Sequence, residues 1–325
     1  MSASTDAALS AAPTTSEFIN LAHLTYSREY GTLPEGVAPF APDGGSGPLA
    51  LEVEADGFYG AAFQTSSGQV IIAFEGTYLS ALFEEADLAP ALGAADPEFA
   101  LAQIAADLEI YRGQAPAAFD DALHFTETVL ASAGKQGIGA EDVFVTGHSL
   151  GGAEAEYVSA RLGLAGETYG APGLPAADVP GRDAPLTNYV EYGDPVGNYS
   201  ATPENHLGGF LYSDQILRYG DPDYIGAWIA RAGLEAAGAE FGPGTTPQQN
   251  AEGLLLLAGL AEGFHVLTTY ARDLHVTLID PSVPVPPAGP SALAGAPDGS
   301  LAAADRGGLA ALVPNAEAAA APWFA

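Results

Sequence analysis

The segment VFVTGHSLGGA, residues 143–153, contains a serine with a glycine two positions away on each side. The serine is Ser149, and the glycines are Gly147 and Gly151. In a Gly-x-Ser-x-Gly turn a strand passes sharply into a helix, and the glycines allow a strained backbone that exposes the serine oxygen as a nucleophile. We therefore expect a nucleophilic serine, with a glycine-rich turn around an ordinary serine as the alternative. His148 is expected to pack in the turn rather than act as a base.

A serine nucleophile needs a base that accepts its proton and a carboxylate that orients the base. In folds that carry the serine on such a strand-to-helix turn, these residues follow one another along the chain in the order Ser, Asp, His. Asp194 lies in TNYVEYGDPVGN, where residues 188–192 predict a strand that ends at Gly193. Loops at strand ends are where sheets present catalytic groups, so Asp194 is the candidate acid. The alternative is an Asp-Pro pair that only initiates a turn.

Three histidines follow Ser149 in the chain, namely His206, His265 and His275. His265 comes after a glycine-ended helical segment and can therefore lie on a loop, a suitable place for a base. His275 falls in an alternating run that predicts a strand, where a half-buried structural histidine is expected. His206 lies in a loop segment and is the second choice as base.

Acyl transfer also needs N–H donors for the negative oxygen that forms, each commonly worth about 3 kcal/mol. One expected donor is the backbone N–H of Leu150, the residue after the nucleophile. The second is expected in IIAFEGTYLS, residues 71–80, which offers a strand, a turn at Gly76 and then Thr77. A plain hairpin end is the alternative for this segment.

Four segments in this order resemble the class 3 lipases, the α/β-hydrolase family that includes the fungal triacylglycerol lipases. IIAFEGT resembles the family's oxyanion segment, V-x-A-F-R-G-[ST], and TGHSLGGA matches its nucleophile turn. TYGAPGLP resembles the family's T-F-G-x-P-R-x-G segment. YVEYGDPVG resembles its acid turn, in which a strand runs into D-P-V-P. The resemblance covers roughly residues 16–275. It implies an α/β-hydrolase fold with Ser149 as nucleophile, Asp194 as acid, His265 as base, and Thr77 with Leu150 as oxyanion donors.

The sequence departs from the family pattern at several positions. Glu75 stands where the family has an arginine, and a carboxylate near an oxyanion site opposes the charge that forms there unless it points away. Gly197 replaces a proline, and Glu154 and Glu156 lie on a helix where the family is more apolar.

An insert, residues 195–264, separates the candidate acid from the candidate base. It contains two expected helices, DYIGAWIARAGLEAAG and NAEGLLLLAGLAEGF. We expect these helices, with residues 79–94, to form the wall of an acyl pocket and a lid.

The elements around these residues alternate between strand and helix, which predicts an α/β fold with a mostly parallel sheet flanked by helices. The expected elements are a helix from Phe18, a hairpin of residues 50–63 and 69–74, helices from residue 95 and after Pro116, a strand at 142–146, a helix at 153–162, and strands at 167–169, 186–192 and 275–279. Residues 1–15 are expected to be a flexible N-terminus and 16–280 the catalytic domain. Residues 281–325, rich in Pro, Gly and Ala, are expected to be an extended or disordered tail.

The charge balance excludes two classes of partner. The 325 residues include 41 acidic and 9 basic side chains, for a net charge of −32. Nucleic acids and anionic lipid headgroups bind clusters of Lys and Arg, which this chain lacks. The absence of cysteine excludes disulfides, thiolate zinc sites and cysteine nucleophiles.

No membrane-spanning or export segment is expected from the sequence. The first residues show neither a basic region nor a continuous apolar region of the Sec-type signal peptide. The longest strongly apolar run, residues 254–260, is far short of the roughly 20 residues that span a bilayer. The chain is expected to be soluble, and either cytoplasmic or exported by a non-Sec route.

The expected function is that of a serine carboxylester hydrolase, a lipase or esterase that forms an acyl-enzyme on Ser149. Its substrate would be a small-molecule or lipid ester, with contact to neutral lipid at an interface. The alternatives are a phospholipase A1 or a polyester or feruloyl-type esterase on the same fold, or an inactive hydrolase fold that only binds. This chemistry requires no cofactor, and although surface carboxylates could bind Ca²⁺, no loop has EF-hand spacing.

Overall fold

A computed structural model describes most of the chain between residues 12 and 280. The described residues are 12–42, 44, 47–77, 97–180, 185–201, 213–242 and 244–280. His206, residues 79–94 and the expected tail lie outside them, as does most of the expected N-terminal segment. The expected domain limits remain predictions.

Helices and strands largely alternate along the chain. The helices are α1 (Thr15–Thr25), α3 (Pro97–Tyr111), α4 (Ala117–Lys135), α5 (Leu150–Leu162), α6 (Arg231–Ala239), α7 (Pro247–Phe264) and α8 (Leu267–Asp273). The strands are β1 (Val37–Pro39), β2 (Ala50–Val53), β3 (Phe58–Thr65), β4 (Val70–Phe74), β5 (Val143–His148), β6 (Ala165–Tyr169), β7 (Leu174–Pro175), β8 (Leu186–Glu191), β9 (Ser200–Ala201), β10 (Ser213–Leu217) and β11 (Asp221–Ile225). Short 3₁₀ turns are η1 (Glu54–Asp56), η2 (Ala140–Asp142), η3 (Ala176–Asp178) and η4 (Trp228–Ala230).

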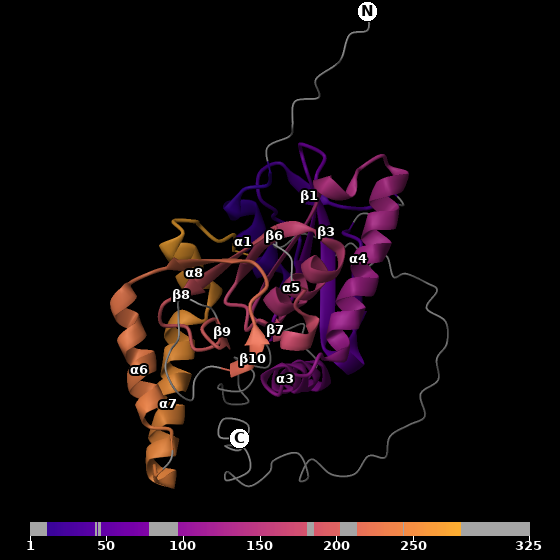
Figure 1. Ribbon diagram of the computed structural model, residues 1–325. Coiled ribbons are helices and arrows are strands. Elements are labelled where there is room, and N and C mark those ends of the chain that lie inside the picture. Colours follow the sequence, from indigo (N-terminus) through magenta and orange to yellow (C-terminus); the bar gives the residue numbers. More distant parts are fainter. Residues whose placement is uncertain are drawn as a thin grey trace, which may run out of the picture.

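The main sheet has eight strands among the described residues, in the order β1-β3-β4-β5-β6-β8-β11, with β2 paired to β3. Strands β1, β2 and β4 run antiparallel to β3, whereas β4, β5, β6, β8 and β11 run parallel to one another. Runs such as VIIAF in β4 suit a strand that is buried on both faces. The chain is therefore an α/β protein with a mixed, mostly parallel sheet (Figure 1).

Helices cover both faces of this sheet. Helices α1 and α8 lie on one face, where Phe18 and Tyr270 belong to the same apolar cluster as Ile71. Helices α4 and α5 lie on the other face, where Phe125 and Val158 pack into the second cluster. A small sheet, β7-β10-β9, lies apart from the main one.

The register of the parallel strands brings their carboxyl ends together. Phe74 of β4 lies opposite Gly147 of β5, and His148 lies opposite Tyr169 of β6. The segments that follow β4, β5, β6 and β8 therefore meet at one edge of the sheet, where α/β proteins bind ligands.

Most of the expected elements are confirmed, with shifted ends. The run at residues 50–63 forms two strands rather than one, because η1 and a left-handed Gly57 (φ 69°) interrupt it. The helix expected at 153–162 begins at Leu150, since the serine turn passes directly into α5.

The helix expected over DYIGAWIARAGLEAAG is wrong in its first part. Residues 221–225 form β11, which pairs in parallel with the edge of β8. Pro222 is tolerated there because an edge strand does not need every backbone donor. The helix, α6, begins only at Arg231, whereas the second expected helix is confirmed as α7.

The strand expected at residues 275–279 is also wrong. His275 adopts a left-handed conformation (φ 59°) and is exposed, so it is not the half-buried residue that the alternation predicted. The Asn20 side chain of α1 accepts from Ile279 N at 2.7 Å and donates to Thr277 O at 3.3 Å. A side chain thus satisfies backbone groups that a neighbouring strand would otherwise bind.

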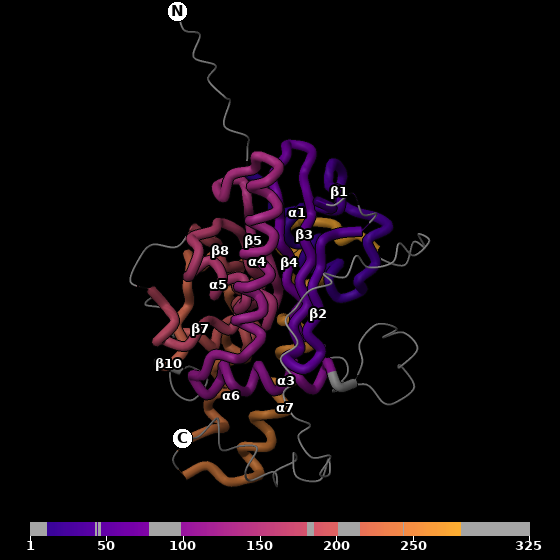
Figure 2. The backbone as a smooth tube through the Cα atoms, turned by 90° about the vertical axis from the view of Figure 1, so that its right-hand side faces the viewer, coloured from indigo at the N-terminus to yellow at the C-terminus, as the bar shows by residue number. Residues whose placement is uncertain are grey.

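The last part of the insert between the candidate acid and base forms a helical hairpin, after β9, β10 and β11. Helices α6 and α7 pack against each other and extend away from the sheet (Figures 1 and 2). Among the described helices, none by itself is long and apolar enough to cross a membrane. Helices α7 and α8, which are bent by 54° relative to each other, together have the length and the apolar composition of a span.

Candidate active site

Ser149 occupies the sharp turn between β5 and α5. Its φ of 57° and ψ of −126° lie outside the regions that residues with side chains favour. A Cβ on Gly147 would lie 2.1 Å from Gly151 O, and a Cβ on Gly151 would lie 2.3 Å from Phe74 O. The turn that presents the serine therefore requires glycine at both flanking positions, as the sequence pattern predicts.

Ser149, His265 and Asp194 lie in one hydrogen-bonded row. His265 Nε2 is 2.8 Å from Ser149 Oγ, and His265 Nδ1 is 2.9 Å from Asp194 Oδ2. All three side chains are buried. Because an ionised carboxylate only accepts hydrogen bonds, Nδ1 of the neutral imidazole carries the proton, and Nε2 accepts from the serine hydroxyl.

The three residues come from separate elements that converge at the carboxyl edge of the sheet. Ser149 follows β5, Asp194 lies in the turn after β8, and His265 is the residue at the C-terminal end of α7. The chain between Asp194 and His265 adds β11 to the sheet and then returns through α7, which ends directly before His265.

Asp194 is held by several donors. Val196 N donates to Oδ1 at 2.8 Å, and the Tyr270 hydroxyl donates to Oδ2 at 2.5 Å. Burial acts to raise the pKa of Asp194, but the His265 imidazole, the Tyr270 hydroxyl and the Gly197 amide outweigh it and hold the pKa below its usual value. The carboxylate is therefore ionised at neutral pH.

Gly170, directly after β6, forms the floor beneath the Asp–His contact. It has a φ of +60°, and a Cβ there would lie 2.8 Å from Asp194 Oδ2 and 3.1 Å from His265 Nδ1. Any larger residue would push the carboxylate and imidazole apart. The backbone conformation and the close approach both require glycine at this position.

His148 connects the serine turn to the backbone of the candidate base. Its Nε2 is 2.6 Å from His265 O and its Nδ1 is 2.6 Å from the Tyr26 hydroxyl. Burial and the neighbouring His265 lower the pKa of His148 to about 3, so its ring is neutral. Since a carbonyl only accepts, Nε2–H donates to His265 O and Tyr26 donates to Nδ1. His148 thus packs and positions, as expected.

Thr77 and Leu150 follow the carboxyl ends of the neighbouring strands β4 and β5. Thr77 follows β4, and its hydroxyl donates to Asp107 Oδ2 at 2.7 Å. Burial raises the pKa of Asp107 to about 6, although the hydrogen bond from Thr77 acts in the opposite direction. Leu150 is the first residue of α5, and the first amides of a helix have no acceptor within the helix. The roles of Thr77 and Leu150 as oxyanion donors remain predictions.

Glu75, the departure from the family pattern, is fully buried against Arg28. Arg28 Nε lies 3.0 Å from Glu75 Oε2, and the guanidinium also stacks on the rings of Tyr59 and Phe99. Burial raises the pKa of Glu75 to about 7, against the effect of Arg28. One of the chain's few arginines therefore balances the carboxylate that precedes the Gly76–Thr77 turn.

The other departures have different environments. A Cβ on Gly197 would lie 2.9 Å from Asp194 Oδ2, so the proline of the family pattern would crowd the acid here. Glu156 accepts from Tyr219 N at 3.1 Å, and burial raises its pKa to about 7. Neither carboxyl oxygen of the buried Glu154 has a hydrogen-bond partner among the described residues.

Three residues of the site were missed by the sequence analysis, namely Tyr26, Asp107 and Tyr270. Each acts on an expected site residue from another part of the chain, so no local pattern marks it. A fourth missed residue, Gly170, did have a signal, because it lies in the TYGAPGLP segment.

No metal centre is found in the described part of the chain, where no group of three or more His, Cys, Asp or Glu side chains is arranged to hold an ion.

Comparisons with known proteins carry no argument about the function. No family model matches the chain, and no curated protein matches it. Among solved structures, the extracellular lipase LipA from Serratia marcescens shares 18% identity and a TM-score of 0.34, over 51% of this chain and 29% of that chain. The chain thus spans less than a third of that protein's length. The structural similarity to this lipase is weak. The function therefore has to be inferred from the side chains of the site.

Proposed function

We propose that this protein is a serine hydrolase that cleaves carboxylic esters through an acyl-enzyme on Ser149. The observation that carries the proposal is the buried row in which Ser149 Oγ, the His265 imidazole and the Asp194 carboxylate are joined at 2.8 Å and 2.9 Å. A nucleophile, its base and an orienting carboxylate in this order are the requirements of acyl transfer by serine.

In the acylation step, Ser149 Oγ attacks the carbonyl carbon of the ester while His265 Nε2 accepts the hydroxyl proton. The carbonyl oxygen becomes negative and is stabilised by the backbone N–H groups of Thr77 and Leu150. Collapse of this intermediate expels the alcohol, which takes the proton from His265. The acyl group remains on Ser149.

In the deacylation step, water attacks the acyl carbonyl and gives its proton to His265 Nε2. The second tetrahedral intermediate expels Ser149 Oγ, which regains the proton, and the carboxylic acid leaves. In both steps Asp194 holds the Nδ1–H tautomer and stabilises the imidazolium that forms.

The low content of basic residues favours uncharged esters as substrates. With a net charge of −32, the protein repels anionic substrates, and ester groups need no cation for recognition. The ion pair of Glu75 with Arg28 supports an active enzyme over a fold that only binds, because it balances the charge next to the Thr77 loop.

An activity-based probe tests the proposal. A fluorophosphonate should label the wild-type protein and fail to label Ser149→Ala, and p-nitrophenyl ester turnover should fall by about four orders of magnitude or more in that variant. Ser159→Ala is the matched control, since Ser159 is a buried serine on α5, the helix that follows Ser149, and its hydroxyl donates to Leu164 O. Undiminished labelling or turnover of Ser149→Ala would overturn the proposal. For the active wild-type enzyme, a panel of p-nitrophenyl esters, phospholipids, polyesters and feruloyl esters defines the substrate class.

A further inference from the structure

Gln103 of α3 is a buried glutamine whose side chain faces the turn after β4. The side chain is fully buried, and its Nε2 donates to Gly76 O at 3.0 Å. Because a carbonyl oxygen only accepts, the NH₂ end of the amide faces the turn. The Gln103 side chain also forms a hydrogen bond with Glu75, which acts to lower the pKa of that carboxyl group. One amide therefore binds two consecutive residues of the turn.

The carbonyl that Gln103 binds belongs to the same peptide group as the N–H of Thr77. The described residues contain no cis peptide bond, so Gly76 O and Thr77 N–H point to opposite sides of this peptide group. A hydrogen bond at the carbonyl therefore fixes the direction of the N–H. It also polarises the peptide group, which makes the N–H a stronger donor.

The part of the turn before this peptide group is held by the sheet and by close packing. Glu75 N donates to the backbone of β3 at 3.0 Å. A Cβ on Gly76 would lie 2.2 Å from the Tyr26 hydroxyl and 2.3 Å from His148 O, so the turn has no room for a larger residue. The contact with Gln103 adds a hydrogen bond at the carbonyl itself.

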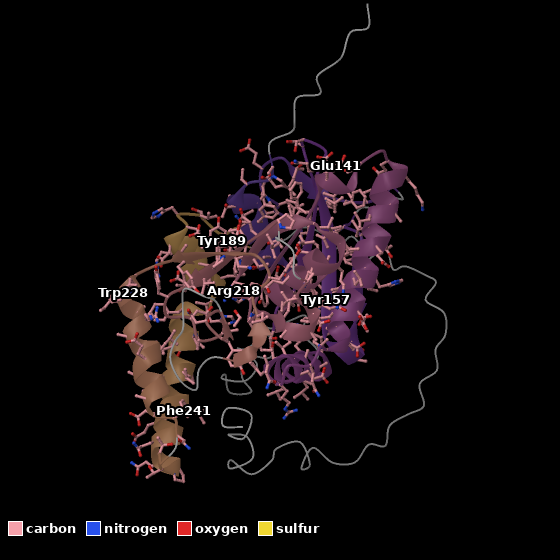
Figure 3. The ribbon with its side chains drawn as sticks, viewed as in Figure 1. Glu141, Tyr157, Tyr189, Arg218, Trp228 and Phe241 are labelled. Carbon is pink, nitrogen blue, oxygen red and sulfur yellow. The ribbon has the colours of Figure 1, made fainter. Side chains whose placement is uncertain are left out.

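Helix α3 gives the amide a rigid support. A Cβ on Gly57, at the end of η1, would lie 2.5 Å from Gln103 N, so the two backbones are in direct contact. Ala106 of α3 shares an apolar cluster with Leu150 and Tyr157 of α5. Figure 3 shows α3 below Tyr157, at the lower end of α5 in this view. A side chain that positions a reacting group requires such a fixed base.

We propose that Gln103 is a positioning residue that holds the Gly76–Thr77 peptide group so that the Thr77 N–H faces the negative oxygen of the tetrahedral intermediate. This inference rests on the proposed function, because it names the residue that prepares one of the two oxyanion donors. A donor that is oriented in advance costs no reorganisation when the charge forms. The contribution of Gln103 therefore falls on the transition state rather than on binding of the ester.

Gln103→Met tests this role in the turnover of a p-nitrophenyl ester. Methionine has a similar length and no donor, so kcat should fall at least about tenfold with KM unchanged. A trifluoromethyl ketone, which forms a charged tetrahedral adduct with Ser149, should bind more weakly by the same factor. The ether analogue of the ester has no carbonyl oxygen and should bind as tightly as to the parent protein, whereas a merely destabilised site would lose both affinities.

Two further variants separate positioning from packing. Gln103→Asn keeps a buried amide but withdraws the donor by one methylene group, so it should lose kcat in the same way. Gln69→Met is the matched control, because Gln69 is a 2% exposed glutamine that lies directly before β4, at the opposite end of this strand from Thr77. Its Oε1 accepts from Ser67 Oγ at 2.9 Å, and its loss should leave kcat unchanged.

Equal kcat and equal ketone affinity in Gln103→Met, Gln103→Asn and the parent protein would overturn the proposal. A rise in KM alone would also overturn it and would assign Gln103 to packing.

An NMR measurement distinguishes failure of this inference from failure of the proposed function. The ¹⁵N resonance of an amide responds to a hydrogen bond at the carbonyl of the same peptide group. The Thr77 resonance should therefore shift in Gln103→Met and stay in place in Gln69→Met, and an unchanged resonance in both would overturn the inference. A parent protein without turnover or fluorophosphonate labelling would overturn the proposed function, and a shifted Thr77 resonance would then still show that Gln103 orients the peptide group.

Discussion

Arg28 and Glu75 form an ion pair directly beside the turn that leads to Thr77, with Arg28 Nε 3.0 Å from a carboxylate oxygen that is fully buried. Arg28 also binds the more exposed Glu52 at 2.7 Å. The chain has only nine basic residues, and one of them is used to balance a carboxylate at the edge of the candidate site.

Removing this arginine should destabilise the protein. Arg28→Met leaves Glu75 buried without its partner, and the expected cost is about 3–5 kcal/mol in the free energy of unfolding. The measurement is urea unfolding, with Arg161→Met as control, since the Arg161–Asp178 pair is more exposed and should be worth less than about 1 kcal/mol. The double variant Arg28→Met, Glu75→Gln should recover part of the loss, and an equal loss in the double variant would contradict the role of the pair.

Tyr270 should act on catalysis through Asp194. Tyr270→Phe removes the hydroxyl that donates to Asp194 Oδ2, so the carboxylate orients His265 less well. We expect kcat for a p-nitrophenyl ester to fall about tenfold with KM unchanged, as for an interaction made mainly in the transition state. The pKa of Asp194 should rise at the same time, because the carboxylate loses a donor, and an NMR titration of the Asp194 carboxyl group would report this rise. A change in KM alone would assign Tyr270 to substrate binding or to packing.

Gly170→Ala should separate activity from stability. The added methyl group would lie 2.8 Å from Asp194 Oδ2 and 3.1 Å from His265 Nδ1, so the acid and base cannot keep their contact. We expect kcat/KM to fall at least about a hundredfold, from the loss of positioning. Circular dichroism checks that the fold remains. Gly134→Ala on α4 is the control, because a Cβ there meets nothing within 4 Å. An active Gly170→Ala enzyme would show that the Asp–His contact is dispensable.

The buried Glu154 should make stability fall as pH rises. Burial raises its pKa well above the usual value, so the folded state holds a proton that the unfolded state releases above about pH 4.5. Glu156, with a pKa of about 7, and Glu191, with a pKa of about 8, act in the same direction. The contribution of these three carboxyl groups to the stability of the fold is therefore greatest at low pH and is lost between about pH 5 and 8.

Glu154→Leu should remove part of that loss. The leucine side chain has a volume similar to that of glutamate and no unsatisfied oxygen. The free energy of unfolding should therefore increase by about 1–3 kcal/mol, the cost of a buried unpaired polar group, and the increase should be larger at pH 8 than at pH 5. Thermal unfolding at both pH values gives the measurement, and Glu127→Leu, at an exposed position of α4, controls for the loss of a surface charge. An equal gain at both pH values would contradict the titration of Glu154.

The sequence predicts much of this site because its parts lie in local patterns. The glycines around Ser149 are needed by the turn itself, and a carboxylate after an apolar strand marks the acid turn at Asp194. His265 is predictable as a histidine after a helix, since a helix end presents its last side chain to the next loop. The alternating order of elements likewise predicts the α/β fold.

Other features depend on contacts between distant segments, which no local pattern encodes. Residues 221–225 form a strand because β8 offers a free edge, and residues 277–279 are not a strand because Asn20 binds their backbone. The supports from Tyr26, Asp107 and Tyr270 exist only once the sheet has brought these elements together.

Composition, the order of strands and helices, and the serine turn are thus properties of the sequence itself, since they depend on neighbours in the chain. The 2.8 Å and 2.9 Å contacts of the buried row, the balancing of Glu75 by Arg28, and the exposed leucines of α7 are decided by the tertiary structure. The reason is physical, because burial and the choice among distant partners set hydrogen bonds, charge and exposure, and both arise only when the chain packs.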